Sequence, residues 1–214
     1  MRDLIVMNAA FTYFLASAGP AEKRWMAEVA LTRAYGQVGA VAGQIADRIA
    51  VARDAQGLGR LLHDVGERMD YVRDRQAQAV RSAASLDAGL AGFATFALQQ
   101  KARLELSIRE RASALGLGPI QPVRPPARPG ADRMVVRRKR MGTITLDDLP
   151  RDQREGFPPA SFWGVPVSAL YWCDGKRTLA EVIRLTELEM GPQTMDFVGY
   201  FRFLEKHGYV EFVK

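Results

Sequence analysis

The chain has 214 residues, of which 48% are hydrophobic and 25% are charged, a composition typical of one large or two small globular domains rather than of a disordered chain. Its single cysteine, Cys173, excludes a disulfide within the chain and a zinc site made of cysteines alone. The net charge of +6 is concentrated in residues 116–142, which carry seven basic side chains and one acidic one, so the sequence does not predict a broad basic face.

The first segment, residues 4–18, carries no charge and spaces Leu4, Met7, Phe11 and Leu15 as one face of a helix. We therefore expect a buried first helix in a cytoplasmic protein. The small residues at its end are also typical of a signal-peptide cleavage site, so export is the alternative if residues 1–18 are a signal peptide. The segment is too short to span a bilayer, and we expect no transmembrane segment.

A second helix is predicted from about Ala21 to about Gln56, after the Gly19-Pro20 break. Glycine is unfavourable inside a helix, so a cluster of small residues on two turns favours the close approach of another helix backbone; tolerance of glycine in a long helix is the alternative. The cluster consists of Gly36, Gly39, Ala40 and Gly43. The predicted inward stripe consists of Trp25, Val29, Val38, Ala42, Ile45 and Ile49.

After a turn predicted at Gly57-Leu58-Gly59, residues 58–115 repeat apolar side chains at 3-4 spacing for about five heptads, which favours coiled-coil-like packing. Gly89 and Gly92 could kink this helix or split it. Two long helices joined by a short turn predict an antiparallel hairpin over residues 1–115. Such a hairpin leaves apolar surface uncovered, so we expect a homodimer or a missing partner domain.

Residues 116–140 read as a linker that is rich in proline and arginine, with five prolines between residues 116 and 132. It ends in a basic run, which predicts either an anionic-surface or nucleic-acid patch or, with more weight, a basic linker or edge strand. The basic side chains of this run are Arg133, Arg137, Arg138, Lys139 and Arg140.

Residues 141–214 predict a small winged-helix-like module, with a strand near 142–146, three short helices and a closing strand at 209–213. Thr178 and Glu181 have the spacing of a capping box. Winged helices often bind DNA, but residues 143–214 hold 8 basic and 11 acidic side chains, which disfavours DNA. Leu188 and Phe203 fall off the main apolar faces and are predicted to form a protein-docking surface.

The sequence offers no catalytic, cofactor-binding or metal-binding residues that we can assign. His63 lies among charged residues and His207 follows a predicted helix, and neither has the spacing of a known metal motif. The adjacent carboxylates Asp147 and Asp148 are expected to cap a turn. Cys173 is expected to be a core thiol.

Four segments of the C-terminal half resemble the C-terminal extension of bacterial zinc-dependent aminopeptidase-like proteins, which belong to di-zinc metallopeptidase family twenty-eight. The segments are 142–150, 155–158, 169–182 and 196–210. Residues 1–115 are similar to the region between the peptidase core and that extension. None of the family's zinc ligands has a match in this chain, so the resemblance implies a non-catalytic half, with zinc held only by the family's catalytic domain.

The sequence thus predicts a mainly α protein, with a long helical hairpin or bundle followed by a winged-helix-like α+β module. The expected function is a non-catalytic scaffold for oligomerisation and protein interaction, as a homodimer or docked to a peptidase-type domain. The alternatives are a winged-helix DNA-binding regulator and a peptidase-family member that is active only when joined to a catalytic domain.

Overall fold

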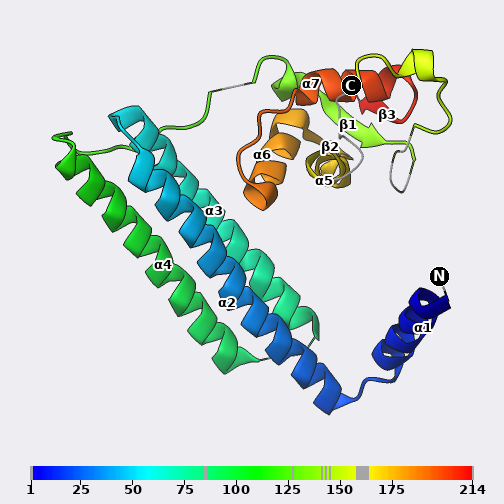
Figure 1. The fold of residues 1–214 in the computed structure, drawn as a ribbon, viewed down its shortest axis with the longest axis horizontal. Helices are drawn as coiled ribbons and strands as arrows, with labels where there is room; N and C mark the ends of the chain where they lie inside the picture. The colour runs from blue at the N-terminus through cyan, green and yellow to red at the C-terminus, as the bar shows by residue number, and fades with distance from the viewer. Residues whose placement is uncertain are drawn as a thin grey trace. The chain divides into compact units, whose positions relative to one another are not determined.

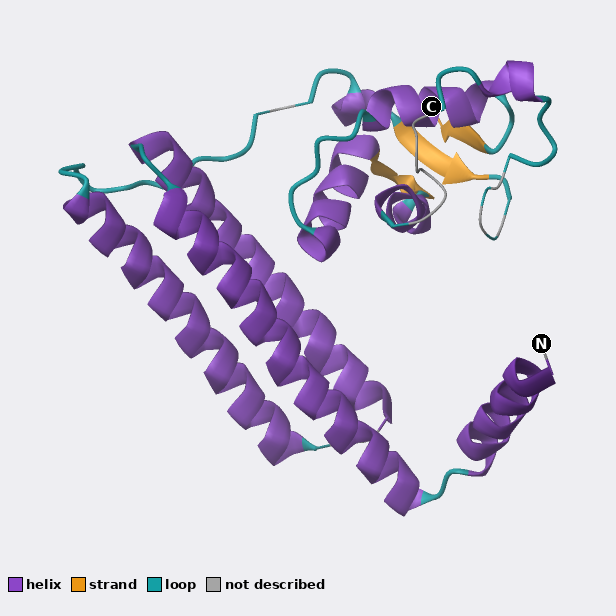
Figure 2. Ribbon diagram, viewed as in Figure 1, coloured by secondary structure: helices purple, strands orange, loops and turns teal. Residues whose placement is uncertain are grey.

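The computed structural model describes residues 2–83, 86–126, 128–140, 142, 144, 146–157 and 164–213. The chain divides into a helical unit, Met1–Arg124, and a C-terminal unit, Pro125–Lys214, each with a hydrophobic core of its own (Figure 1). The fold is mainly α, as predicted, with a small antiparallel sheet in the C-terminal unit (Figure 2). The boundary between the units lies inside the predicted linker.

The helical unit begins with α1 (Arg2–Ser17) and continues with three long helices, α2 (Pro20–Val51), α3 (Ala55–Ala83) and α4 (Asp87–Ala114). Each of the three long helices packs against the other two, so the unit is a three-helix bundle, the second of the two predicted forms, and not a two-helix hairpin. The predicted helix 58–115 is divided near Leu86, upstream of Gly89 and Gly92, which both lie inside α4.

The turn between α2 and α3 lies at residues 52–54, not at the predicted Gly57-Leu58-Gly59. The carboxylate of Asp54 accepts a hydrogen bond from the backbone N–H of Gly57 at 2.6 Å. A side-chain acceptor at this place satisfies one of the free N–H groups at a helix start, so α3 begins before the glycines.

The bundle core follows the predicted heptads through most of its length. Val65, Met69 and Val72 of α3 are buried, as are Leu90 and Phe93 of α4. The ring of Tyr35 on α2 lies 5.4 Å from that of Phe93 and 5.0 Å from that of Phe96. Aromatic pairs at this distance add to the stabilisation from burial, so this contact fixes α4 against α2.

Two predictions about burial near the N-terminus are wrong. The first helix was predicted to be buried, but the side chains of Met7 and Phe11 are 60% and 61% exposed. Trp25 and Val29 were assigned to the inward face of α2, but they are 57% and 44% exposed. Over the described residues, the chain contains no helix with both the length and the apolar character that a membrane crossing needs.

The first part of the predicted linker packs on the bundle. Val123 donates its backbone N–H to the carbonyl of Gly59 at 2.9 Å, and Leu117 and Ile120 lie against the bundle core. A Cβ at Gly59 would lie 2.7 Å from the carbonyl oxygen of Gln121. Gly59 is therefore a contact point for an extended segment rather than a turn residue.

The C-terminal unit contains a three-stranded antiparallel sheet in the order β2-β1-β3. Its strands are β1 (Val135–Arg138), β2 (Asp174–Thr178) and β3 (Val210–Val213). Its helices are α5 (Val165–Trp172), α6 (Leu179–Met190) and α7 (Phe197–Lys206), with the short 3-10 turns η1 (Ala131–Arg133) and η2 (Arg151–Arg154). The three predicted helices and the closing strand are present, and β2 was not predicted.

The position of β1 corrects two expectations. The basic run was predicted to be a linker or an edge strand, but β1 is the central strand and pairs with both neighbours. The strand expected near 142–146 is absent at the described residues 142, 144 and 146, although Ile144 and Leu146 are buried; residues 143 and 145 lie outside the described residues. The capping box at Thr178 and Glu181 is confirmed at the start of α6.

Candidate functional site

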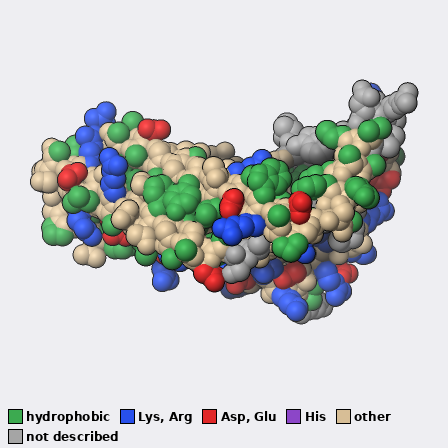
Figure 3. All heavy atoms as spheres, turned by 90° about the horizontal axis from the view of Figure 1, so that it is seen from below, with side chains coloured by type: hydrophobic (Ala, Val, Ile, Leu, Met, Phe, Trp, Pro, Cys, Tyr) green, Lys and Arg blue, Asp and Glu red, His purple; other side chains and the backbone are tan. Residues whose placement is uncertain are grey.

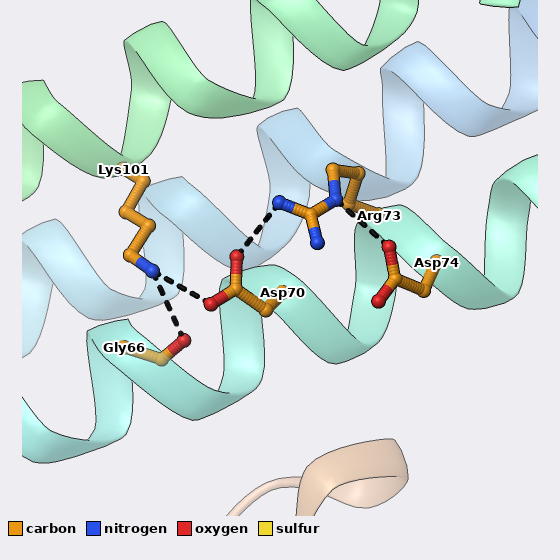
Figure 4. Close-up of polar contacts among 5 residues, drawn as sticks. All are labelled: Gly66, Asp70, Arg73, Asp74 and Lys101. Atoms are coloured by element: carbon orange, nitrogen blue, oxygen red, sulfur yellow. Dashed lines mark hydrogen bonds and ion pairs between the residues drawn. The ribbon is translucent and has the colours of Figure 1, made fainter.

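A connected group of charged side chains joins α3 to α4 in the bundle. The ammonium of Lys101 lies 2.7 Å from the Asp70 carboxylate, which also pairs with Arg73 at 2.9 Å (Figure 4). Arg73 pairs in turn with Asp74 at 2.8 Å, and Lys101 also reaches the carbonyl of Gly66. Since each carboxylate accepts from a cation, the group acts as a clamp between the two helices.

His63 lies in a second polar region of the bundle, with Glu67 at 3.6 Å and Asp64 beside it in the sequence. Asp64 is engaged by Arg48 of α2 at 2.7 Å. A zinc site needs three or more ligands around one point. Among the residues that the structure describes, no three His, Cys, Asp or Glu side chains converge in this way, so the described residues do not fit the zinc site of the resembled family.

Of the five basic residues predicted as an anionic-surface patch, three interact with other side chains or carbonyls of the C-terminal unit. Arg137 pairs across the sheet with Glu211 of β3, and Arg140 pairs with Asp148. Arg138 donates to the carbonyl of Gly142 at 2.8 Å, and its guanidinium lies 5.1 Å from the centre of the Tyr171 ring. Arg133 and Lys139 are exposed and make no ion pair within the described part of the chain.

Asp148 is the centre of a small network rather than only a turn cap. The hydroxyl of Tyr209 and the guanidinium of Arg140 both donate to its carboxylate. These two hydrogen bonds, with the Tyr209 bond as the larger cause, lower the pKa of the Asp148 carboxyl. Burial, followed by the Asp148 bond, raises the pKa of Tyr209 to about 12. The network ties the basic run to the start of β3.

The structural boundary changes the electrostatic argument about DNA. Counted over 125–214, the C-terminal unit holds 14 basic and 12 acidic side chains, so the unit as the structure bounds it is no longer net negative. Basic and acidic side chains are also interspersed over the face of the molecule in Figure 3. What weighs against phosphate binding is that Arg137 and Arg140 already face carboxylates.

The predicted docking residues Leu188 and Phe203 are both only 8% exposed. The ring of Phe203 packs between Phe157 at 5.3 Å and His207 at 4.6 Å. A docking residue must be open to its partner, so this prediction is wrong. Both residues lie off the main apolar stripe of their helices, but both belong to the buried residues of α6 and α7.

Several exposed apolar side chains that the sequence did not predict to be exposed lie at the start of the helical unit. We call them the N-terminal apolar surface: Val6, Met7, Phe11, Tyr13, Trp25 and Val29. The ring of Trp25 meets that of Phe14 edge-on at 6.3 Å, which joins α1 to α2. Where exposed large apolar side chains gather at a surface, they mark a site of protein or membrane contact. For Val6, Met7, Phe11 and Tyr13, the sequence signal is the uncharged run 4–18, which is equally typical of a buried helix.

Cys173 provides a test of the C-terminal core. Its thiol is buried and donates to the carbonyl of Ala169 at 3.3 Å. Burial raises the pKa of Cys173 from 9.0 to about 12. In the unfolded chain the thiol ionises near pH 9, whereas in the folded chain it keeps its proton, so its contribution to stability is present below pH 9 and declines as the pH rises toward 12.

We therefore expect the free energy of unfolding at pH 10 to fall by about 1 kcal/mol more in the natural chain than in Cys173→Ala. Denaturant unfolding of both proteins at pH 7 and pH 10 measures the difference. Burial is the main cause of the raised pKa of Tyr200 and of Tyr209 and is present in both proteins, so the contributions of the two tyrosines nearly cancel. An equal pH dependence in the two proteins would show that the thiol is not buried.

No model of a known family, no curated protein and no solved structure matches this chain. The resemblance to the extension of zinc-dependent aminopeptidase-like proteins therefore stays a prediction.

Proposed function

We propose that this chain is a non-catalytic scaffold that binds protein through its helical unit, with the winged-helix-like unit as a second interaction module. The observation that carries the proposal is the N-terminal apolar surface. Trp25 and Phe11 are each more than half exposed, and large aromatic side chains supply much of the binding energy of protein interfaces. Leaving them in water is unfavourable, which favours a protein partner that covers them.

The partners that we propose are a second copy of the chain or a peptidase-type domain, the latter favoured by the sequence resemblance. The organisation of the helical unit supports a scaffold role. Its polar clamp around Asp70 and Lys101 and its continuous core make it a rigid support, and rigid helices present a binding surface at low entropic cost.

A DNA-binding regulator is the second candidate, favoured by the helices and sheet of the C-terminal unit and by the exposed Arg133 and Lys139. Only these two members of the basic run lack an intramolecular ion pair or cation–π contact within the described residues. A gel shift with duplex DNA at several salt concentrations separates the candidates, because phosphate binding weakens steeply with salt. We expect no salt-sensitive complex at micromolar protein.

Site-specific photo-crosslinking tests the scaffold. A photoreactive phenylalanine analogue at Phe11, in cells that naturally produce the chain, is expected to form covalent adducts with protein. The matched control is the same analogue at Arg103, an exposed position on α4, where few adducts are expected. Mass spectrometry of the adducts tells a second copy from another protein. Equal labelling at the two positions, or none at Phe11, contradicts the proposal.

A further inference from the structure

The outward face of α2 carries a second heptad pattern, opposite the side that packs in the bundle. Its members recur at alternating spacings of four and three residues over about 38 Å of helix. We call them the outer seam: Trp25, Val29, Thr32, Gly36, Gly39, Gly43, Ala46 and Ala50. All eight are exposed, and none can carry a charge. A seam of this period is the pattern with which one helix packs along another.

The glycines of the outer seam have no role inside this chain that the structure explains. A Cβ added at Gly36, Gly39 or Gly43 would meet nothing within 4 Å, although glycine inside a helix is less stable than alanine. The helix expected to approach these residues is therefore not α3 or α4. Small residues at a helix face allow a second backbone to come close, and Trp25 and Val29 extend the same seam with large apolar surface.

The charges beside the seam suggest which helix approaches. Arg33 and Asp47 line one rim, seven residues to either side of Ala40, and within the described part of the chain neither makes an ion pair. In two antiparallel helices, this rim of one faces the same rim of the other. A twofold axis beside Ala40 would then set Arg33 of each copy opposite the partner's Asp47.

The same axis pairs small residues along the seam. Gly39 would lie opposite the partner's Gly43, Gly36 opposite the partner's Ala46, and Thr32 opposite the partner's Ala50. A parallel pairing is less complementary. It would bring Arg33 to the partner's Glu28, but Glu28 already pairs with Arg24 of its own chain at 3.1 Å. It would also place Asp47 beside the partner's Ala42, where no cation faces the carboxylate. Self-complementarity of this kind is what a twofold interface requires.

We propose that two copies of this chain associate through the outer seams of their α2 helices, antiparallel about a twofold axis beside Ala40, with Arg33 of each copy facing the partner's Asp47. This inference rests on the proposed scaffold function and names its partner as a second copy. It involves the helical unit alone.

Sedimentation velocity of the full chain over a range of micromolar concentrations tests the association. We expect a monomer–dimer equilibrium, and we expect Gly39→Gln to raise the dimer dissociation constant at least tenfold. The same substitution is expected to raise the thermal midpoint of the monomer, because glutamine is a better helix former than glycine. If glycine is simply tolerated on a solvent-exposed helix face, Gly39→Gln should raise the thermal midpoint without weakening the dimer.

Charge reversal tests the orientation. Arg33→Asp and Asp47→Arg should each weaken the dimer, and the double variant should restore it. A second measurement uses Ala40→Cys in a Cys173→Ala background: copper-phenanthroline oxidation should give a disulfide-linked dimer, whereas Ala102→Cys, an exposed position on α4, should not.

A monomer at every concentration, including one in which α1 folds over the seam, overturns the inference. So does a dimer that is indifferent to Gly39→Gln, or one that the charge-reversed double variant does not restore. In these cases adducts between Phe11 and a different protein would leave the scaffold function standing, so the two proposals can fail separately.

Discussion

Replacing Phe93 with alanine is expected to destabilise the helical unit by about 3–5 kcal/mol. The Phe93 side chain is fully buried in α4, and its ring packs edge-on against Tyr35 of α2 at 5.4 Å. The substitution therefore removes apolar burial, leaves a cavity between two helices and deletes an aromatic pair. Denaturant unfolding followed by far-ultraviolet circular dichroism measures the loss, since the long helices dominate that signal.

Leu98→Ala on the same helix is the matched control. Leu98 is 52% exposed, so its truncation should change the free energy of unfolding by no more than about 0.5 kcal/mol. If Phe93→Ala cost as little as the control, the packing of α4 against α2 would be wrong. The proposed dimer should weaken with Phe93→Ala, because the outer seam depends on the bundle that supports α2.

Periodicity predicted much of the bundle because buried residues on α3 and α4 recur at heptad spacing. The strict heptad that places Val65 and Val72 in the core also places Ala79 there. Val65 and Val72 are buried, but Ala79 is exposed, and Ala77 and Val80 are buried instead. An α-helix of 3.6 residues per turn rotates away from a strict 3.5 repeat. The break near Leu86 was placed too late because glycine was taken as the signal for it.

Which face of α2 is covered could not be read from the sequence. Trp25 and Val29 belong to the same exposed heptad pattern as the glycines of the outer seam, whereas Val38, Ile45 and Ile49 lie on the buried face of α2. Hydrophobicity favoured joining the large residues into one stripe, although they lie on different sides of the helix. A pattern identifies a face that can pack, and the rest of the fold decides what covers it.

In the C-terminal unit, the helices and the closing strand were predicted, whereas the central strand β1 was not. The capping box at Thr178 and the helix–strand order after it are local signals, and they were correct. The basic run gave no hint that β1 would be the middle strand, because its pairing with β2 and β3 joins residues far apart in the chain. Cross-strand partners such as Glu211 for Arg137 are visible only once the register is known.

Replacing Phe201 with alanine is expected to destabilise the C-terminal unit by about 3–5 kcal/mol while leaving the helical unit folded. Phe201 is fully buried on α7, and its ring lies 5.1 Å from that of Tyr200. Each unit has its own core, so the two should unfold in separate steps. Reaction of Cys173 with Ellman's reagent reports the C-terminal unit, and circular dichroism reports the bundle.

The adjacent substitution Arg202→Ala is the control, because Arg202 is exposed on the same helix. We expect Phe201→Ala to make the Cys173 thiol react at least tenfold faster at neutral pH, since reaction of a buried thiol requires local opening, and Arg202→Ala to leave the rate unchanged. An equal loss of stability in the bundle would mean that the two units fold as one, and the helical unit could then no longer be treated as a scaffold in its own right.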